Sequence, residues 1–235
     1  MQRQGSPLGS ADLARHRSVR RRPLSLNLQA GTLYNLPPPT QGLASLMILG
    51  LFERLGVSQA ESFEHVHGLV EATRQAFQVR DTHLGDPAYM AVHATTYLSD
   101  SLLDRMAAAL PRRQAQPRPV ATSIGDTAWV GVIDGQGRAV SFIQSLSQAF
   151  GSGLLLAETG VLWHNHGTGF SLDEAGRNTL SPGRKPLHSL SPALARLRDG
   201  RVMVYGGMGG DVQPQRMHRG QHGAGVFRQM PAGGG

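Results

Sequence analysis

The sequence contains no cysteine, which excludes disulfides, thiolate metal sites and a cysteine nucleophile. It has no run of 18 or more apolar residues, so no segment is predicted to span a membrane. Residues 1–10 lack the apolar stretch of a secretory signal, and we expect a cytoplasmic protein. Acidic side chains are fewer than basic ones, 16 against 23, which leaves a formal net charge of +7.

Basic side chains gather in three places, at residues 15–22, at residues 112–118 and beyond residue 216. An excess of positive charge raises the question of nucleic-acid binding. However, no aromatic side chains alternate with these arginines, as a single-strand binding face requires. We therefore expect solvated arginines in loops and no nucleic-acid partner. A basic nucleic-acid-binding protein stays as a lesser alternative, which a titration in rising salt would reveal.

The first half of the chain favours helices. Residues 36–42 include three prolines, which stiffen an extended entry to a helix predicted over residues 42–55. That helix is apolar nearly all round, so it should be buried, and Thr40 is expected to cap it.

Two more helices are predicted over residues 59–80 and 99–110. The first of them carries residues spaced three and four apart, which predict one core-facing stripe. The members of this stripe are Phe63, Val66, His67, Val70, Thr73 and Phe77.

The second half of the chain favours strands. Segments 128–133 and 138–145 flank the sequence Asp134-Gly135-Gln136-Gly137, which is a hairpin signal. Further strands are predicted over residues 24–28, 153–157, 160–164, 193–197 and 202–206. Helices followed by a strand-rich block indicate an α+β layered domain.

The chain divides into four regions by composition. Residues 1–110 form the helical region, and residues 111–126 are rich in proline and arginine, which predicts an exposed flexible linker. Residues 127–215 form the strand-rich region. Residues 216–235 are rich in glycine and show no periodicity, so this tail is expected to be disordered.

Gly125-Asp126-Thr127 stands where the linker meets the first strand of the hairpin. A threonine hydroxyl becomes an effective nucleophile when threonine is the N-terminal residue, because its own α-amine then serves as the base. Such chemistry requires cleavage of the Asp126–Thr127 bond, for which an exposed linker is suitable. An Asp-Thr pair is also common in turns and caps, so this motif alone leaves both interpretations open.

Glycines and histidines offer two other candidate sites. The sequence Gly207-Met208-Gly209-Gly210-Asp211 follows a strand, and its backbone N–H groups suit either an oxyanion or a tight turn. His164 and His166 would lie on one face of a strand, as a surface pair or as metal ligands. No His-Glu-x-x-His pattern is present, and no metal or organic cofactor is predicted.

Several short motifs occur in a distinctive order along the chain: Leu36–Gly42, Glu71–Ala72, Arg80–Asp81, Gly85–Pro87, Asp126–Thr127, Asp134–Val140, Phe150–Gly153, Thr159–Gly160, Asn165, Phe170, Pro182–Pro186, Ser189–Pro192 and Gly209–Gly210. In order and spacing they resemble the γ-glutamyltranspeptidases of the N-terminal-nucleophile hydrolase superfamily. The similarity covers about residues 5 to 215. It implies a four-layer αββα sandwich, of which this chain would be a central piece, incomplete at both ends.

The resemblance also assigns roles to individual residues. Thr127 matches the nucleophile that self-cleavage after Asp126 sets free. Gly209 and Gly210 match the glycines of the family's oxyanion hole. The two products of cleavage would stay together as a heterodimer.

Five further positions match the surroundings of the nucleophile and the substrate. Ser145 and Ser147 stand where the family has a threonine and an asparagine around the nucleophile. His188 and Ser189 stand where two serines hold the carboxylate of the acyl donor, and His166 stands where the family has glutamine or glutamate.

Some positions depart from the family pattern. Ala128-Trp129 replaces the usual threonine and histidine after the nucleophile, and Gly169 replaces the aspartate that holds the donor's α-amino group. The arginine that clamps the donor carboxylate would lie upstream of residue 1. These departures resemble the branch of the family that contains acylases and amidohydrolases of small acids.

The resemblance implies an amidohydrolase or acyltransferase that acts on γ-glutamyl or related small acyl amides. The reaction would pass through an acyl-enzyme on Thr127, which water or an acceptor amine resolves, without a cofactor. The alternative is an inactive, truncated member of the family. Self-cleavage distinguishes the two, because it splits the chain before Thr127.

Overall fold

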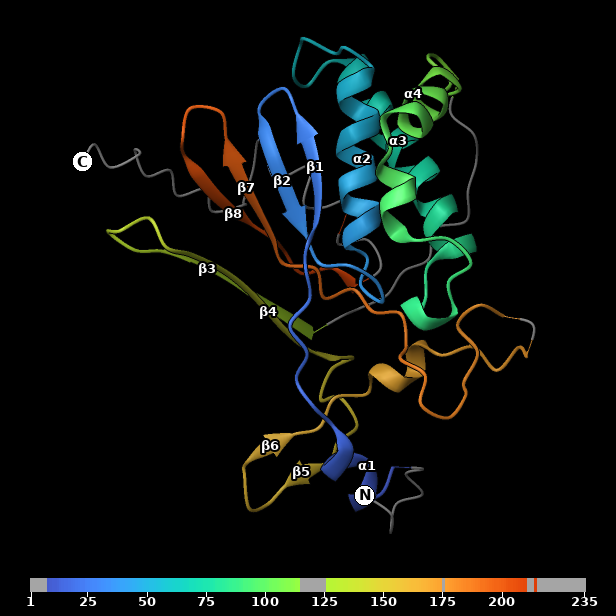
Figure 1. Cartoon of the computed structure of the whole chain (residues 1–235), viewed down its shortest axis with the longest axis vertical. Helices are drawn as coiled ribbons and strands as arrows, with labels where there is room; N and C mark the ends of the chain where they lie inside the picture. The colour runs from blue at the N-terminus through green and yellow to red at the C-terminus, as the bar shows by residue number, and fades with distance from the viewer. Residues whose placement is uncertain (1–7, 115–125, 175, 211–213, 215–235) are drawn as a thin grey trace.

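The computed structural model describes residues 8–114, 126–174, 176–210 and 214. Figure 1 shows helices α2, α3 and α4 on one face of an antiparallel sheet, with the hairpin β3–β4 extending from the end of the sheet. A short helix, α1 (Ser10–Arg15), lies in the N-terminal arm. Residues 115–125 of the predicted linker and the whole predicted tail, residues 216–235, lie outside the described residues.

The sheet joins strands from both ends of the chain. Its order is β1 (Leu24–Leu28), β2 (Gly31–Asn35), β7 (Ala193–Leu197) and β8 (Val202–Tyr205), and every neighbouring pair is antiparallel. The predicted strands over residues 24–28 and 193–197 are confirmed residue by residue. Gly31 pairs with Leu197, and a side chain at Gly31 would collide with the backbone of β7, so only glycine allows this approach.

Helix α2 (Gly42–Arg54) forms the centre of the core, as its apolar sequence predicts. Leu43, Leu46 and Leu51 are completely buried between the sheet and the other helices. The N-cap residue is Gln41 rather than the predicted Thr40. The Thr40 hydroxyl nevertheless accepts a hydrogen bond from the Gly42 N–H at 3.0 Å, so it still satisfies one donor of the first turn.

Helix α3 (Phe63–His83) begins later than predicted and buries a different face. Phe63, Val66 and Val70 are exposed, so the predicted stripe is wrong in its first half, although Thr73 and Phe77 are buried. The buried face of α3 instead includes three small residues: Gly68, Ala72 and Ala76. A Cβ on Gly68 would lie 2.7 Å from Leu55 Cδ1, so close contact between α2 and α3 decides the buried face.

The remaining helices follow in sequence. Two short 3-10 helices, η2 (Pro87–Tyr89) and η3 (Ala94–Leu98), lead into α4 (Asp100–Ala108), which lies within the helix predicted over residues 99–110. Leu103 and Ala107 of α4 pack into the core. Among the described residues, no helix combines the length and apolar character needed to cross a bilayer.

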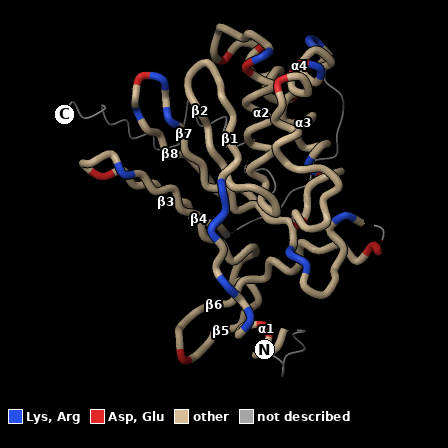
Figure 2. Tube along the Cα trace, viewed as in Figure 1, with Lys and Arg blue, Asp and Glu red and all other residues tan. Residues whose placement is uncertain are grey.

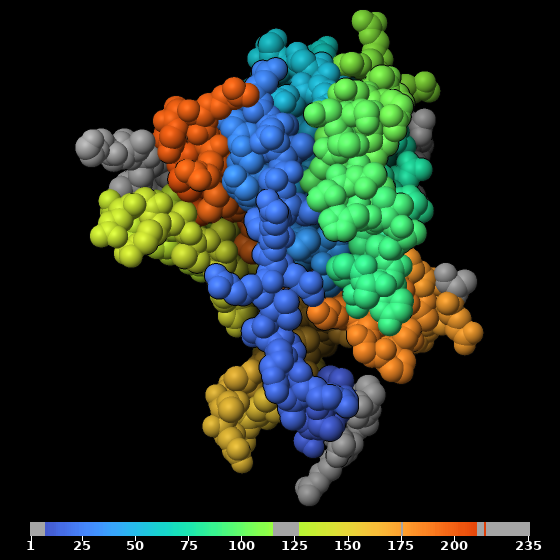
Figure 3. Space-filling model, viewed as in Figure 1, coloured from blue at the N-terminus to red at the C-terminus, as the bar shows by residue number. Residues whose placement is uncertain are grey.

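The predicted hairpin is confirmed as β3 (Asp126–Ile133) and β4 (Ala139–Ser147). One of its faces packs on β8, where a Cβ on Gly131 would lie 2.7 Å from Val204 Cγ2. The opposite face is apolar and exposed: Val130, Val132, Val140 and Phe142. Figure 3 shows the hairpin projecting from the body of the molecule.

A smaller lobe follows the hairpin. Strands β5 (Leu155–Leu156) and β6 (Val161–Leu162) are shorter than the predicted strands around them. They lead to the 3-10 helix η4 (His166–Gly169) and a long loop that returns to β7. Figure 2 shows basic residues distributed over the N-terminal arm, the helices and several loops.

Candidate active site

Thr127 lies at the start of β3 and is 8% exposed. Its hydroxyl donates a hydrogen bond to Ser145 Oγ at 2.9 Å, and Ser145 Oγ also accepts a hydrogen bond from the Ser147 N–H at 2.9 Å. The strand register is irregular between Asp126 and Thr127, and Ser147 has a positive φ of 79°. Such an irregularity changes the direction of a side chain at the end of a strand pair. Here it lies between Asp126 and Thr127, at the predicted cleavage point.

Gly209 and Gly210 follow β8, the strand that packs against the hairpin β3–β4. Gly131 meets Val204, and Trp129 meets Gly206, so the two segments run antiparallel. The φ angles of 145° at Gly209 and 53° at Gly210 turn their backbone N–H groups in directions that other residues rarely adopt.

Three histidines form a cluster beside this strand end. The ring of His166 meets the rings of His164 and His188 edge to face, with centroids 4.8 and 5.9 Å apart. Burial lowers the pKa of all three rings, and the charges that neighbouring histidines would carry also lower it for His166 and His188. The pKa of His188 falls to about 4, so this ring is neutral at neutral pH.

Asn165 links the cluster to the end of β4, the strand that pairs with β3 and its Thr127. Its N–H donates to the carbonyl oxygen of Leu146 at 3.0 Å, and its side chain exchanges two hydrogen bonds with Gln148. Leu146 lies between the two serines that surround Thr127. The family resemblance placed Asn165 among its motifs, and the structure gives that residue a positioning role.

His188 is held from a different part of the chain. Its N–H donates to the carbonyl oxygen of Pro39 at 3.0 Å. Its Nδ1 accepts from the Leu190 N–H at 3.3 Å, so the neutral ring carries its hydrogen on Nε2. The carbonyl oxygen of neighbouring Ser189 accepts from the Ser191 hydroxyl at 3.2 Å.

His188 also lines a cavity of about 420 Å³ between η4, the following loop and α3. Its lining includes Arg80 and Asp81 of α3, which form an ion pair at 2.7 Å. It also includes Gly169, where a Cβ would lie 3.0 Å from the carbonyl oxygen of Leu187. Sequence reasoning missed one basic lining residue, Arg177, because its loop shows no periodicity.

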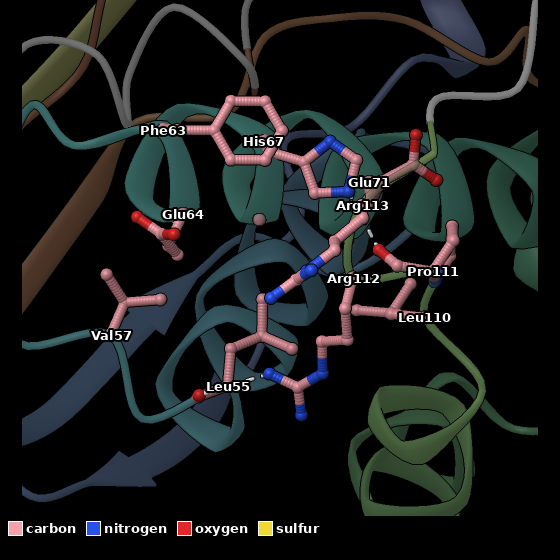
Figure 4. Close-up of a pocket in the computed structure, with 11 residues that line it drawn as sticks. Leu55, Val57, Phe63, Glu64, His67, Glu71, Leu110, Pro111, Arg112 and Arg113 are labelled. Atoms are coloured by element: carbon pink, nitrogen blue, oxygen red, sulfur yellow. Dashed lines mark hydrogen bonds between the residues drawn. The ribbon is translucent and has the colours of Figure 1, made fainter.

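A second cavity of about 470 Å³ contains none of the predicted site residues. It lies between the end of α2, the start of α3 and residues 110–113 (Figure 4). Phe63 and His67 stack with ring centroids 5.1 Å apart, and His67 Nε2 contacts the carbonyl oxygen of Pro111 at 2.8 Å. These contacts hold the end of the helical region in place.

The structure thus gathers the predicted residues into two groups. Thr127, Ser145 and Ser147 share one hydrogen-bonded group. The predicted substrate residues His166 and His188 meet each other in the histidine cluster. Over the described part of the chain, no three His, Asp or Glu side chains are arranged to hold a metal ion.

Comparison with known proteins agrees with the motif resemblance. The family model described as gamma-glutamyltranspeptidase matches residues 1–219. An oxamate amidohydrolase proenzyme from Klebsiella pneumoniae is 49% identical over 211 residues, which cover 90% of this chain and 40% of that protein. The glutathione hydrolase-like YwrD proenzyme from Bacillus subtilis is 38% identical over 222 residues, which cover 92% of this chain and 41% of that protein.

A solved structure confirms the predicted fold class. A cephalosporin acylase from Bacillus halodurans matches with a TM-score of 0.80 and 30% identity. The match covers 91% of this chain and 39% of the acylase. The α+β architecture of the N-terminal-nucleophile hydrolases is therefore the architecture of this chain, which spans about 40% of the length of these relatives.

Proposed function

The chain belongs to the gamma-glutamyltranspeptidase family, and we propose from this premise that it is a self-processing amidohydrolase with Thr127 as nucleophile. The observation that carries the proposal is the buried Thr127 hydroxyl at an irregular strand start, 2.9 Å from Ser145 Oγ. The names of the relatives give support, because both curated relatives are proenzymes. Processing into two chains that remain associated follows from the proposal.

Self-cleavage begins with the Thr127 hydroxyl. Its oxygen attacks the carbonyl carbon of Asp126, the peptide C–N bond breaks, and the Thr127 nitrogen takes the hydroxyl proton. Water then hydrolyses the resulting ester, which leaves the Asp126 carboxylate and a free α-amine on Thr127. Ser145 Oγ positions the hydroxyl for the attack, because it accepts the hydrogen bond that the hydroxyl donates before its proton is transferred.

Amide hydrolysis reuses the same oxygen. The α-amine of Thr127 takes the hydroxyl proton while the oxygen attacks the amide carbon, and the departing amine carries that proton away. The Gly209 and Gly210 N–H groups stabilise the oxyanion, and loss of one such donor costs about 3–4 kcal/mol in comparable sites. Water, or an acceptor amine, then releases the acyl group from Thr127.

We propose a small carboxylate-bearing amide, of the oxamate type, as substrate rather than a γ-glutamyl amide. A γ-glutamyl donor carries an ammonium group, and burying that charge without a partner costs several kcal/mol. In the family pattern an aspartate pairs with this ammonium group, and its position is occupied here by Gly169, which has no carboxylate. Oxamate has no ammonium group, and an oxamate amidohydrolase proenzyme is 49% identical to this chain.

Electrophoresis and N-terminal sequencing test the processing step. The full chain should split in two, with the smaller product beginning Thr-Ala-Trp, and Thr127→Ala should stay intact. Thr122→Ala serves as the matched control, because it removes another threonine of the same region and should still be cleaved. A folded wild-type chain that stays intact on long incubation would point to the inactive alternative.

Kinetics test the substrate. The ratio kcat/KM should be higher for oxamate than for γ-glutamyl-p-nitroanilide. A ten-fold preference for the glutamyl donor, about 1.4 kcal/mol in transition-state binding, would refute the substrate assignment and leave an ordinary transpeptidase.

A further inference from the structure

The cavity beside His188 holds more positive than negative charge. Arg80 and Arg177 line it, and Asp81 is the carboxylate in the described lining. Asp81 already pairs with Arg80 at 2.7 Å. The described lining therefore carries two guanidinium charges against one carboxylate charge, which leaves a net positive charge.

One of the two guanidinium charges belongs to Arg177. Its Nε and Nη1 donate to the carbonyl oxygens of Asp81 and Leu84, which are neutral acceptors. Burial, and next the charge of Arg80, lower the pKa of Arg177, whereas Asp81 raises it. A guanidinium fixed by two backbone oxygens keeps further N–H groups in a fixed plane, which suits a carboxylate.

Two polar side chains shape the same cavity. Asn178 bridges its two sides, because its Nδ2 donates to the Gly169 carbonyl and its Oδ1 accepts from the Leu187 N–H at 3.1 Å. His188 contributes the hydrogen on Nε2, which no described residue accepts. A carboxylate in the cavity would therefore meet a cationic donor and a neutral donor.

We propose that Arg177, in the lining of this cavity, is a specificity-determining partner of the carboxylate of the acyl substrate. The inference rests on the proposed function and adds the group that reads the substrate's charge. A cavity of about 420 Å³ lies within the range of small-molecule sites. The histidine cluster connects this cavity to the hairpin that holds Thr127, because His188 meets His166, which follows the Asn165 that binds β4.

Calorimetry with malonate, which has no amide to hydrolyse, tests binding apart from turnover. Wild-type chain should bind malonate, and Arg177→Met should weaken binding at least ten-fold. Arg177→Lys, which keeps the charge but loses the planar fork, should give an intermediate affinity and covers the case in which the methionine variant does not fold. Arg198→Met removes an exposed arginine of the β7–β8 turn and should bind as the wild type does.

Two further arms separate the proposals. Inorganic phosphate at the same concentration should not displace malonate; displacement through Arg177 would identify a general anion site and overturn the inference. In turnover experiments, Arg177→Met should raise the KM for oxamate at least ten-fold and should leave the KM for acetamide unchanged. Equal malonate affinity in wild type and Arg177→Met also overturns the inference, whereas malonate binding without chain cleavage defeats only the proposed function.

Discussion

Acid is expected to destabilise the folded chain through His188. The pKa of this ring is about 4 in the folded chain and 6.5 in its ordinary state, because the fold buries it and places His166 and His164 beside it. A histidine with a lowered pKa favours the unfolded chain when it is protonated. Its contribution to stability is therefore complete above about pH 6.5 and is lost as the pH falls towards 4.

The size of the effect follows from the gap between the two pKa values. Each pH unit corresponds to about 1.4 kcal/mol, so the whole gap amounts to about 3 kcal/mol, of which about 2.5 kcal/mol is lost by pH 4.5. His164 and His166 act in the same direction, because their pKa values are also lowered. Asp134 and Asp199 also have lowered pKa values, but their contribution is lost only below about pH 4.

Urea unfolding at several pH values between 7.5 and 4.5, followed by tryptophan fluorescence, measures this loss. The matched variant is His188→Asn, whose side-chain oxygen can still accept from the Leu190 N–H. The variant should lose less stability than the wild type over the same interval, by about 2 kcal/mol. Parallel pH profiles for the two proteins would refute the reasoning, because they would show that His188 does not titrate on unfolding.

Three other substitutions test the packing that positions the site. Leu46→Ala empties the centre of α2, where the side chain is completely buried, and should cost about 2–5 kcal/mol in urea unfolding. Gly206→Val should displace the Trp129 indole, which occupies the space of any side chain there, with a shifted fluorescence maximum and slower chain cleavage as the readouts. Arg54→Met breaks ion pairs with two exposed aspartates of α4 and should change stability by less than about 1 kcal/mol in a thermal melt.

Local signals were enough to predict much of the fold. The hairpin follows from a glycine-rich turn between alternating strands, and the burial of α2 follows from its continuous apolar sequence. The buried face of α3 did not follow, because periodicity favours large apolar residues such as Val66 and Val70. At Gly68 the structure buries a small residue instead, since Leu55 at the end of α2 leaves no room there for a side chain.

The candidate site was predictable only where neighbours in sequence or strand register carry it. Thr127 and Ser145 are partners within one hairpin, so a correct prediction of its two strands also places these residues opposite each other. The histidine cluster joins residues from two loops, and its outer member is fixed by a bond to Pro39 far along the chain. No pattern among neighbouring residues in the sequence indicates a contact between residues so far apart. Arg177 was not predicted for the same reason.

The departures from the family pattern act together in the structure. Gly169 and His188 line one cavity, and His166 meets His188, so these changes share a single environment. An aspartate at position 169 would add a second negative charge to a lining that holds Arg80, Arg177 and Asp81, and would leave no net positive charge. Its Cβ would also press on the Leu187 carbonyl oxygen, 3.0 Å away. The absence of that aspartate therefore removes the partner of an ammonium group and leaves the charge that a carboxylate requires.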